Sequence, residues 1–359
     1  MLDLSRVLAG PLCTMLLGDL GADVIKVERP GAGDETRGWG PPFDDRGESA
    51  YFLSINRNKL SVAADLTTED GRALIRRLID GADVIVDNYR RGALARFGLD
   101  PDVILAARPG LIWLTISGFG PESDRAGYDI VVQAEQGWMS ITGDAEGSPM
   151  RVGVALVDVV TGKDAAISIL AALVRRAMSG IGARLHVALA ASATAALVNV
   201  AQNSLVSGQD AERWGNAHPN LVPYQLFDAA DRQMIVAVGN DAQWRALIAA
   251  LGLDALAADA TLATNAGRLA NRQRVVAAVA ARLTTRTAAE WSAVLDRAGV
   301  PCGVVRTVLE ALGGAGASPL TGIPPSVAPA QVRRRPPLLD EHGTLIRESG
   351  WAAFGAADA

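Results

Sequence analysis

The best candidate for chemistry in this 359-residue sequence is an aspartate inside an apolar run. Asp158 lies within VGVALVDVVTG, where every residue before it is apolar or glycine and two valines follow. A charged carboxylate is costly to bury unless it is hydrogen-bonded or used in a reaction. One interpretation is a helix N-cap, because a long helix is expected to begin nearby. The other is a reactive carboxylate, which backbone amides at a helix start would keep ionised for nucleophilic attack.

Motifs for several common chemistries are missing from the sequence. His186, His218 and His342 are spaced too far apart to share one helix face, which argues against a zinc site. The glycine-containing stretch 30–34 lacks the third glycine and the following helix of a dinucleotide fingerprint, so it predicts a plain turn. The sequence contains neither a P-loop nor a G-x-S-x-G elbow. We therefore expect no metal, no nicotinamide, no ATP chemistry and no acyl-serine intermediate.

Composition and charge exclude several classes of protein. Lys and Arg number 34 against 39 Asp and Glu, and a net charge of −5 disfavours nucleic acid and anionic membranes as partners. Hydrophobic residues make up 49% and charged residues 20%, which is ordinary for a globular chain and excludes disorder. The most apolar tract, 165–174, is half the length of a membrane span, which needs roughly 20 residues. Two cysteines, Cys13 and Cys302, are typical of reduced thiols in the cytosol. We expect a soluble, cytoplasmic protein.

The first half of the sequence alternates strand and helix patterns, which predicts a parallel sheet covered by helices. Helices are expected after Pro11 and after Thr67 or Thr68, and a helical, alanine-rich stretch spans 162–201 with a break at 180–183. The expected strands cover residues 2–7, 22–28, 60–66, 83–87 and 111–116.

A second domain is predicted by the change of pattern after Trp214. A loop is followed by a hairpin that turns at 229–232, a strand at 234–238 and helices to about 298. The length gives a prior of two domains. We place a large domain at 1–205, completed by 315–359, and a small α+β domain at 210–310. The composition of residues 313–318 (GGAGAS) predicts a linker.

Many segments, in order and over nearly the whole chain, resemble the family III CoA-transferases. The pattern is closest to the dicarboxylate branch, exemplified by succinate–hydroxymethylglutarate transferases. The segments that carry the resemblance are LDLSRVLAGP (2–11), LGADVIKVERPGAGDETRGWGPPF (20–43), NRNK (56–59), ADVIVDNYRRGALARFGL (82–99), RAGYD (125–129), RVGVALVDVVTG (151–162), RWGNAHPNLVPYQLF (213–227), AVGND (237–241) and AGVPCG (298–303).

The resemblance implies a fold, an assembly and a mechanism. The fold is an α/β Rossmann-like large domain with a parallel sheet, plus a smaller α+β domain, and two protomers interlock as a homodimer. The family's catalytic aspartate falls on Asp158, which would attack an acyl-CoA thioester to form a mixed anhydride and then an aspartyl-CoA thioester. Such covalent catalysis divides one exchange into easier steps. Coenzyme A is then a co-substrate, and the other partners are small carboxylic acids.

The resemblance also assigns binding residues, by motif position. The positions that it assigns to the acid substrate are Arg57, Arg151, Asn216 and His218. The positions that it assigns to CoA are Leu8, Ala9, Arg29, Ala64, Asp65, Leu66, Thr67, Asn88, Tyr89, Arg90, Arg96, Arg125, Ala126, Gly127 and Tyr128.

Three departures from the family pattern bear on the reaction. Tyr128 stands where the superfamily's racemases have a histidine, which removes one of the two bases that epimerisation needs. GNAHPN (215–220) replaces the glycine-rich flap of the formyl-CoA branch, and RLH (184–186) replaces a strand segment with an acidic residue. Two alternatives stay open: an isomerase of CoA esters that uses Asp158 and a different base, and a non-catalytic acyl-CoA binder.

Overall fold

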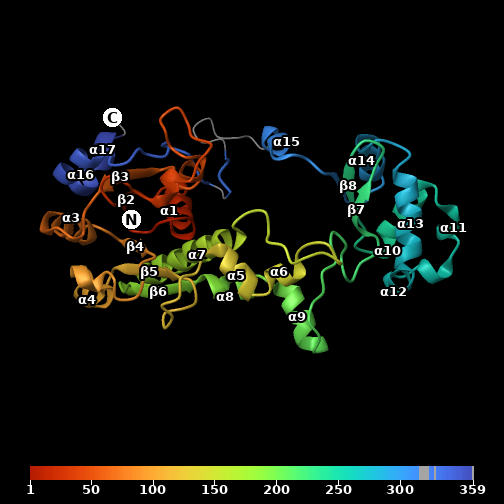
Figure 1. The fold of residues 1–359 in the computed structure, drawn as a ribbon, viewed down its shortest axis with the longest axis horizontal. Coiled ribbons are helices and arrows are strands. Elements are labelled where there is room, and N and C mark those ends of the chain that lie inside the picture. Colours follow the sequence, from red (N-terminus) through yellow and green to blue (C-terminus); the bar gives the residue numbers. More distant parts are fainter. Residues whose placement is uncertain (315–322, 327–328, 358–359) are drawn as a thin grey trace. The chain divides into compact units, whose positions relative to one another are not determined.

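Figure 1 shows the computed structural model, which describes residues 1–314, 323–326 and 329–357. The chain divides into two compact units. The first comprises Met1–Met139, Arg151–Asp210 and Ala315–Ala359, and the second comprises Ser140–Met150 and Ala211–Gly314. Part of the predicted linker, residues 315–318, lies outside the described residues.

The segment Ser140–Met150 packs with the second unit, whereas the sequence-based division places it in the large domain. The guanidinium of Arg213 accounts for this arrangement. It donates hydrogen bonds to three backbone carbonyls of the segment, those of Ser140, Asp144 and Gly147, at 2.7–3.2 Å. This long-range clamp has no local sequence signal.

The first unit is built on a six-stranded sheet with the order β3-β2-β1-β4-β5-β6, in which all neighbouring strands are parallel. Strands buried on both faces and rich in branched apolar residues are typical of a parallel sheet covered by helices. The predicted α/β fold class is confirmed. The strands are β1 (Leu2–Asp3), β2 (Val24–Glu28), β3 (Lys59–Ala63), β4 (Val84–Asp87), β5 (Ile112–Ser117) and β6 (Ala183–Ala188).

Helices cover both faces of this sheet. Adjacent residues of β4 point to opposite faces, so Val86 packs with Cys13 of α1 (Ala9–Asp19) in one core, while Ile85 packs with Leu78 of α3 (Glu69–Asp80) in the other. The remaining helices of this unit are η1 (Glu35–Gly38), α2 (Ala50–Leu53), η2 (Ala95–Phe97), α4 (Pro101–Ala107), α5 (Asp129–Glu135), α7 (Leu156–Ser179), α8 (Leu189–Ala195), α9 (Val198–Ser207), α16 (Gly343–Ser349), η4 (Gly350–Ala352) and α17 (Ala353–Ala357), with α6 (Trp138–Ile141) at the boundary between the units.

A glycine allows α1 and α7 to pack closely at the end that faces the loops of the sheet. A Cβ atom on Gly162 of α7 would lie 2.7 Å from the carbonyl oxygen of Ala9. Because carbon atoms do not approach a backbone oxygen so closely, glycine is required there. This contact fixes the first turn of α1 against the second turn of α7.

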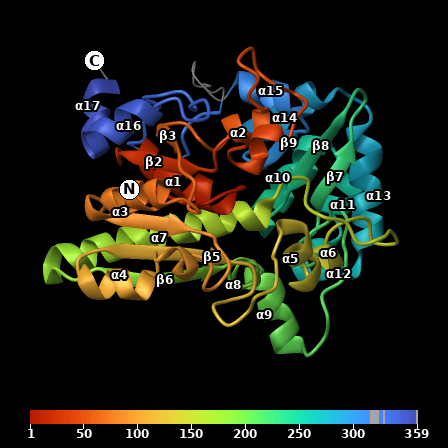
Figure 2. The same cartoon turned by 60° about the vertical axis from the view of Figure 1, so that its left-hand side comes forward.

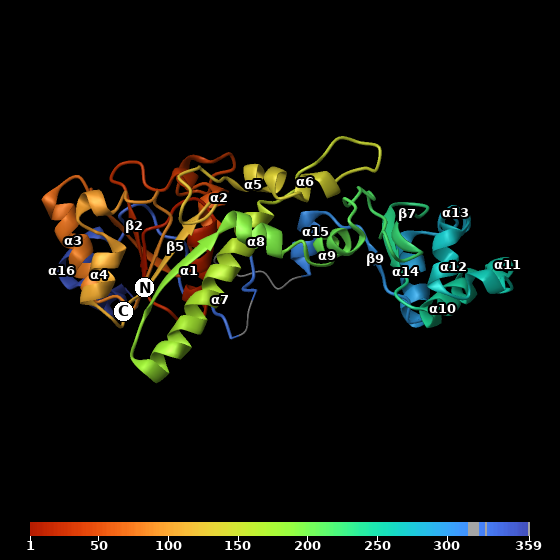
Figure 3. The same ribbon diagram turned by 90° about the horizontal axis from the view of Figure 1, so that it is seen from below.

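The prediction that 162–201 is helical with one break is wrong over residues 183–188, which form β6. Helix α7 ends at Gly180, which adopts a left-handed conformation (φ 72°), and the chain returns beside α7 as an edge strand paired with β5 (Figure 3). Alanine favours helix locally, but hydrogen bonding to β5 outweighs that weak preference. The first strand is also shorter than predicted, because the chain leaves the sheet after Asp3.

The second unit combines a small antiparallel sheet with helices around one core that includes Trp244, Val279 and Trp291. The predicted hairpin is present, with the Ala229 amide donating to the Arg232 carbonyl at 3.0 Å. The elements are β7 (Tyr224–Asp228), β8 (Gln233–Ala237), α10 (Asp241–Leu251), α11 (Asp254–Ala257), η3 (Ala260–Leu262), α12 (Asn265–Ala270), α13 (Arg272–Leu283), α14 (Ala288–Arg297), β9 (Cys302–Val304) and α15 (Val308–Gly313).

The C-terminal helices α16 and α17 belong to the first unit and lie next to β3 and α3 (Figure 2). The His342 amide donates to the Ser61 carbonyl at 3.1 Å, and the Trp351 indole donates to the Leu78 carbonyl at 2.9 Å. Within the described residues, no single helix has both the length and the apolar character of a membrane span. One pair, α8 with α9, passes that test only when its two helices, bent by 71°, are taken together.

Candidate active site

The strand order places a switch point between β1 and β4, the position where ligands bind beyond the carboxyl ends of strands in open α/β sheets. The loops that follow these two strands are joined by the side chain of Asn88. Its amide nitrogen donates to the Arg6 carbonyl at 2.7 Å, and its oxygen accepts from the Arg6 amide at 3.0 Å. Asn88 therefore fixes the two loops to each other at the position where a crevice is expected to open.

Two cavities at this edge of the sheet are lined by residues from the loops after both β1 and β4, and we call them cavity A and cavity B. Cavity A, of about 300 Å³, lies over β2 and β3. Cavity B, of about 510 Å³, lies over β4, β5 and β6 and contains Asp158. Arg6 and Tyr89 line both cavities, so the two adjoin at these residues.

The residues assigned to CoA from the sequence gather at these cavities. Arg96, on η2, lines neither of them. Arg29, Ala64, Asp65, Leu66 and Thr67 line cavity A; Leu8, Ala9, Asn88, Arg90, Arg125, Ala126, Gly127 and Tyr128 line cavity B; and Tyr89 lines both.

Asp158 lies in the first turn of α7, at the third helical position, and does not cap the helix. The N-cap is Ala155, and the capping oxygen belongs to Asp129 of α5, which accepts from the amides of Val157 at 2.8 Å and Asp158 at 3.3 Å. The N-cap interpretation of Asp158 is therefore wrong. Among the described residues, nothing donates a hydrogen bond to the Asp158 carboxylate or forms an ion pair with it.

The electrostatic setting of Asp158 favours its protonated form. Burial, and next the negative charge of Asp129, raise the pKa of Asp158 to about 7. The sequence led us to expect an ionised carboxylate held by helix amides. Asp129 takes those amides instead, and its charge adds to the cost of ionising Asp158. A carboxylate in a cavity whose pKa is raised close to neutral pH is typical of catalytic sites.

Tyr51 is a neighbour of Asp158 that the sequence did not single out. Burial, followed by the charges of Asp158 and Asp129, raises the pKa of the Tyr51 phenol to about 12. The ring packs edge-on against Trp39 with 5.0 Å between centroids. Within SAYFL (49–53) the tyrosine reads as an ordinary core residue of a short helix, so no local signal could have found it.

The loop that carries the RAGYD motif is shaped by two glycines in close contact. A Cβ on Gly118 would lie 2.6 Å from the Cα of Gly127, and one on Gly127 would lie 2.3 Å from the Cα of Gly118. Either Cβ atom would collide with the facing backbone, so the two segments can lie this close only where both residues are glycine. Beside this loop, the Arg125 guanidinium pairs with Glu135 at 2.5 Å and lies over the Phe119 ring.

Arg57, assigned to the acid substrate from the sequence, lies in the protein interior. Its side chain is 2% exposed and donates three hydrogen bonds to Asp19, at 2.6–3.2 Å, and one to the Ile323 carbonyl at 2.7 Å. Since it lines neither cavity, we do not carry Arg57 into the proposed site. The neighbouring Asn58 bonds the same aspartate, at 2.7 Å.

The other residues assigned to the acid also lie outside the cavities. Arg151 is exposed, and its guanidinium donates to the Val152 carbonyl at 3.2 Å. Asn216 and His218 belong to the second unit, where the His218 ring accepts from the Asn220 amide at 3.0 Å. Their roles stay predictions.

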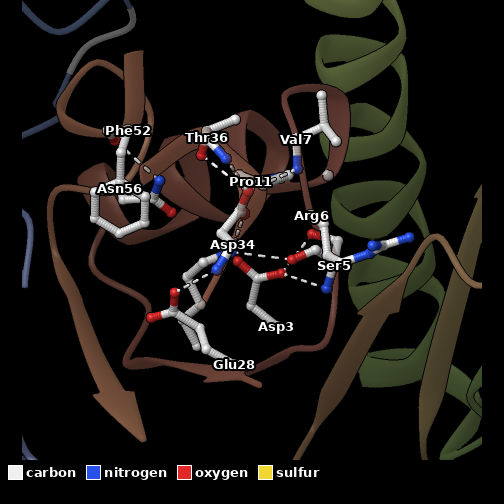
Figure 4. A network of polar contacts seen from close by, with 12 residues as sticks. Asp3, Ser5, Arg6, Val7, Pro11, Glu28, Asp34, Thr36, Phe52 and Asn56 are labelled. Atoms are coloured by element: carbon white, nitrogen blue, oxygen red, sulfur yellow. Dashed lines mark hydrogen bonds and ion pairs between the residues drawn. The ribbon is translucent and has the colours of Figure 1, made fainter. Parts of the chain in front are cut away.

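Beneath the cavities, buried ion pairs hold the loop after β1 (Figure 4). Asp3 accepts from the Ser5 amide at 2.9 Å and from Lys59 at 3.0 Å. Lys26 pairs with Asp34 at 2.9 Å, and Asp34 in turn accepts from the Val7 amide at 3.3 Å. Val7 has a positive φ of 71°, which is strained for a β-branched residue and is sustained by these contacts.

Comparisons with known proteins identify the family. Residues 1–343 match the family model described as CoA-transferase family III. The chain belongs to this family. The α/β architecture and the cavities thus belong to a CoA-transferase, whose substrates include CoA thioesters, and the resemblance seen in the sequence is confirmed. In the described part of the chain, no cluster of three or more His, Cys, Asp or Glu residues is placed to hold a metal ion.

Individual relatives of this family III member are similar over most of their length. The succinate–glutarate CoA-transferase of Agrobacterium fabrum is 42% identical over 317 residues, covering 86% of this chain and 79% of that protein. The succinyl-CoA:glutarate CoA-transferase of Mus musculus is 43% identical, covering 86% and 71%. The crystal structure of a CAIB/BAIF family protein from Brucella suis has a TM-score of 0.86 and 41% identity, covering 97% of each chain.

Proposed function

We propose that this protein transfers CoA from an acyl-CoA to a free dicarboxylic acid, with Asp158 as the nucleophile. The observation that carries the proposal is the position of Asp158, in a cavity lined by nine of the residues assigned to CoA and without a partner among the described residues. The names of the relatives support dicarboxylates as substrates, because they act on succinate and glutarate or their CoA esters.

In this proposal CoA spans both cavities. The nucleotide occupies cavity A, where the exposed Arg29 forms no ion pair with any described residue and can take a phosphate. The pantetheine arm occupies cavity B, which brings the thioester to Asp158. Arg90, likewise exposed and without an ion pair among the described residues, is a further cation on that path.

The reaction proceeds through four exchanges at three carbonyl carbons, those of the donor acid, of Asp158 and of the acceptor acid. A carboxylate oxygen of Asp158 attacks the thioester carbonyl, the carbon–sulfur bond breaks, and CoA leaves as a thiolate from a mixed anhydride. The thiolate attacks the aspartyl carbonyl, which releases the donor acid and forms an aspartyl-CoA thioester. The acceptor carboxylate attacks that thioester and expels the thiolate again. The thiolate then attacks the acceptor's acyl carbon, forming the new acyl-CoA and restoring the Asp158 carboxylate.

The pKa of Asp158 fits this role. With a pKa raised to about 7, a large share of Asp158 is ionised near neutral pH, and the ionised carboxylate is poorly solvated and therefore reactive. No proton has to move in any of the four exchanges, since each nucleophile and each leaving group is an anion. A site without a dedicated proton donor beside Asp158 is consistent with that chemistry.

The proposal includes a homodimer in the cytoplasm. Ile167, Leu170, Val174 and Met178 form an exposed apolar stripe along α7, at helical spacing, and Val198, Leu205 and Val206 of α9 are also exposed. Exposed apolar surface on this scale supports an interface with a second copy. The free thiols Cys13 and Cys302 support a reducing compartment.

The test traps the covalent intermediate. The protein is incubated with succinyl-CoA, treated with hydroxylamine and mapped by mass spectrometry, in the wild type, in Asp158→Ala and in Asp164→Asn. Asp164 is a matched control, because it lies on the same helix, accepts from Ser192 at 2.6 Å and lines neither cavity. We expect a hydroxamate at Asp158 in the wild type and in Asp164→Asn, and none in Asp158→Ala.

The acceptor is tested in the same assay. Glutarate added before hydroxylamine should discharge the aspartyl-CoA thioester and yield glutaryl-CoA, so that no hydroxamate forms, whereas acetate should not. CoA binding without any adduct, across a panel of diacid and monoacid CoA esters, would contradict the transferase mechanism. Deuterium exchange at the α-carbon of a bound ester would then favour the isomerase alternative.

A further inference from the structure

Cavities A and B meet at Arg6, a residue to which the sequence assigns no role. Arg6 follows β1, and its backbone amide and carbonyl are both bonded by the side chain of Asn88. The next residue, Val7, holds a strained conformation. The backbone of Arg6 is thus fixed at the boundary, and its long side chain extends from a rigid base beside Tyr89, the other residue shared by the two cavities.

The Arg6 guanidinium pairs with Glu35, which lines cavity A. Both side chains are about half exposed, at 50% and 42%. The pair lies close to the Tyr89 phenol, since burial raises the pKa of Tyr89, Arg6 lowers it and Glu35 raises it. Half-exposed ion pairs contribute little to stability because solvent screens them, so a ligand can exchange one partner at small cost.

The other cations that line cavity A are not placed to bind a ligand where the two cavities meet. Lys26 is fully buried and committed to Asp34 at 2.9 Å and to the Ser5 carbonyl at 3.0 Å. Arg29 lines cavity A but not cavity B. Among the described lining residues, Arg6 is the cation common to both cavities.

We propose that Arg6 binds the diphosphate of CoA, and that Glu35 holds its guanidinium in the free protein until the diphosphate displaces it. This inference rests on the proposed function, in which the nucleotide lies in cavity A and the pantetheine arm in cavity B. The diphosphate joins those two parts of CoA, so it must cross the boundary. A guanidinium donates two parallel hydrogen bonds to phosphate oxygens, which suits Arg6 for this contact.

The exchange has a consequence that a simple binding residue would not show. Glu35 competes with the diphosphate for the same guanidinium, so removing its charge should tighten CoA binding. Removing the charge of Arg6 should weaken it. The two members of one ion pair are therefore expected to act in opposite directions, and without Arg6 the Glu35 substitution should gain less.

The experiment measures kcat/KM with succinyl-CoA, succinyl-3′-dephospho-CoA and succinyl-pantetheine for the wild type, Arg6→Gln, Glu35→Gln and the double variant. Arg6→Gln should lower kcat/KM about 10- to 50-fold, through KM, for the two substrates that contain the diphosphate. It should leave succinyl-pantetheine unchanged. Glu35→Gln should raise kcat/KM for succinyl-CoA about 2- to 5-fold.

Arg232→Gln is the matched control, because Arg232 pairs with Glu310 at similar exposures (38% and 43%) and lines neither cavity. This variant should leave kcat/KM unchanged for all three substrates. The inference is overturned if Arg6→Gln has the kcat/KM of the wild type with succinyl-CoA. It is also overturned if the loss of kcat/KM disappears with succinyl-3′-dephospho-CoA, which would assign Arg6 to the 3′-phosphate. An equal loss of kcat/KM with succinyl-pantetheine would overturn it as well. A wild type that neither binds CoA nor forms an adduct would instead overturn the proposed function, and this inference with it.

Discussion

Two aspartates of the first unit lie in opposite electrostatic settings. Asp3 is fully buried beneath the cavities, and although burial works against ionisation, Lys59 and Lys26 hold its pKa well below its usual range. Asp158 is only partly buried, yet its pKa is raised to about 7 by burial and by Asp129. The deeper carboxylate is the more firmly charged one, because its partners are built in.

The same contrast separates the arginines. Arg57 is 2% exposed and bonded by both ends of its guanidinium to Asp19 and to a backbone carbonyl. Arg29 and Arg90 lie at the cavities, exposed and without ion pairs among the described residues. A buried charge whose partners are built in stabilises the fold, whereas a charge left without a partner at a cavity is available to a ligand. Whether a charged residue stabilises the fold or binds a ligand therefore depends on its partners in the protein, and not on its residue type.

The largest effect should follow from removing the unpartnered carboxylate. Asp158→Ala should lower the rate of CoA transfer at least about 1,000-fold, since the first nucleophile and the carboxyl group that carries every intermediate are lost. Its urea midpoint should not fall, because no hydrogen bond of the fold depends on this carboxylate. Steady-state rates and urea unfolding of the same preparation check both statements. A large loss of stability would place Asp158 with the scaffold instead.

The converse should hold for the buried pair. Arg57→Met leaves Asp19 buried without its counter-charge, which should lower the free energy of unfolding by about 3–5 kcal/mol. The activity of each folded molecule should remain, because Arg57 lines neither cavity. Urea unfolding and active-site titration measure the two quantities.

Two further variants sharpen this test. Arg76→Gln breaks an exposed pair with Glu69 and should change stability by less than about 1 kcal/mol. Asp19→Asn combined with Arg57→Met should recover part of the loss, since the unpaired charge is gone. A fall in kcat that exceeds the fall in folded fraction would indicate that Arg57 acts on the substrate, as the sequence predicts.

The sequence predicts the scaffold of this site better than it predicts the site's electrostatics. Strands such as β2 and β4 carry branched apolar runs, so local pattern suffices to find them. β6 (Ala183–Ala188) is harder to find, because its short alternation of apolar and polar residues lies inside an alanine-rich stretch that favours helix, and pairing with β5 decides the outcome. The motif positions assigned to CoA gather at the cavities because family resemblance already contains the tertiary arrangement.

Partners that are distant in the sequence are what the residues alone could not provide. Asp129 caps a helix that begins 27 residues later, and nothing local indicates that it takes this role from Asp158. Arg57 and Asp19 are 38 residues apart, and in isolation an arginine within NRNK reads as an exposed cation. Arg6 becomes a candidate only once the cavities are known, and Tyr51 only once its proximity to Asp158 is known.

The raised pKa of Asp158 should make the free energy of unfolding depend on pH. Its pKa in the folded protein, about 7, is higher than the ordinary value of 3.8, so the folded state binds the proton more tightly than the unfolded state. The stability from this proton is present at low pH and is lost as the pH rises through about 7. Asp158→Asn cannot ionise and escapes that loss.

The stability advantage of Asp158→Asn over the wild type should therefore grow by about 1–3 kcal/mol between pH 4 and pH 8, after allowance for the partial exposure of the side chain. Urea unfolding at the two pH values measures it, with Asp164→Asn as the control that should show no such growth. An advantage that shrinks with pH would mean that Asp158 has a stabilising partner, as Asp3 does.

The smallest effect concerns the origin of the raised pKa. Burial is its main cause and the charge of Asp129 the second, so Asp129→Asn should lower the pKa of Asp158 by less than about one unit. The asparagine oxygen can still accept from the Val157 amide, which preserves the start of α7. The rate of adduct formation in a single turnover should then reach half its maximum at a lower pH than in the wild type. A midpoint that stays in place or rises would show that Asp129 acts on Asp158 only by holding the helix, and the contrast between the two aspartates would rest on burial alone.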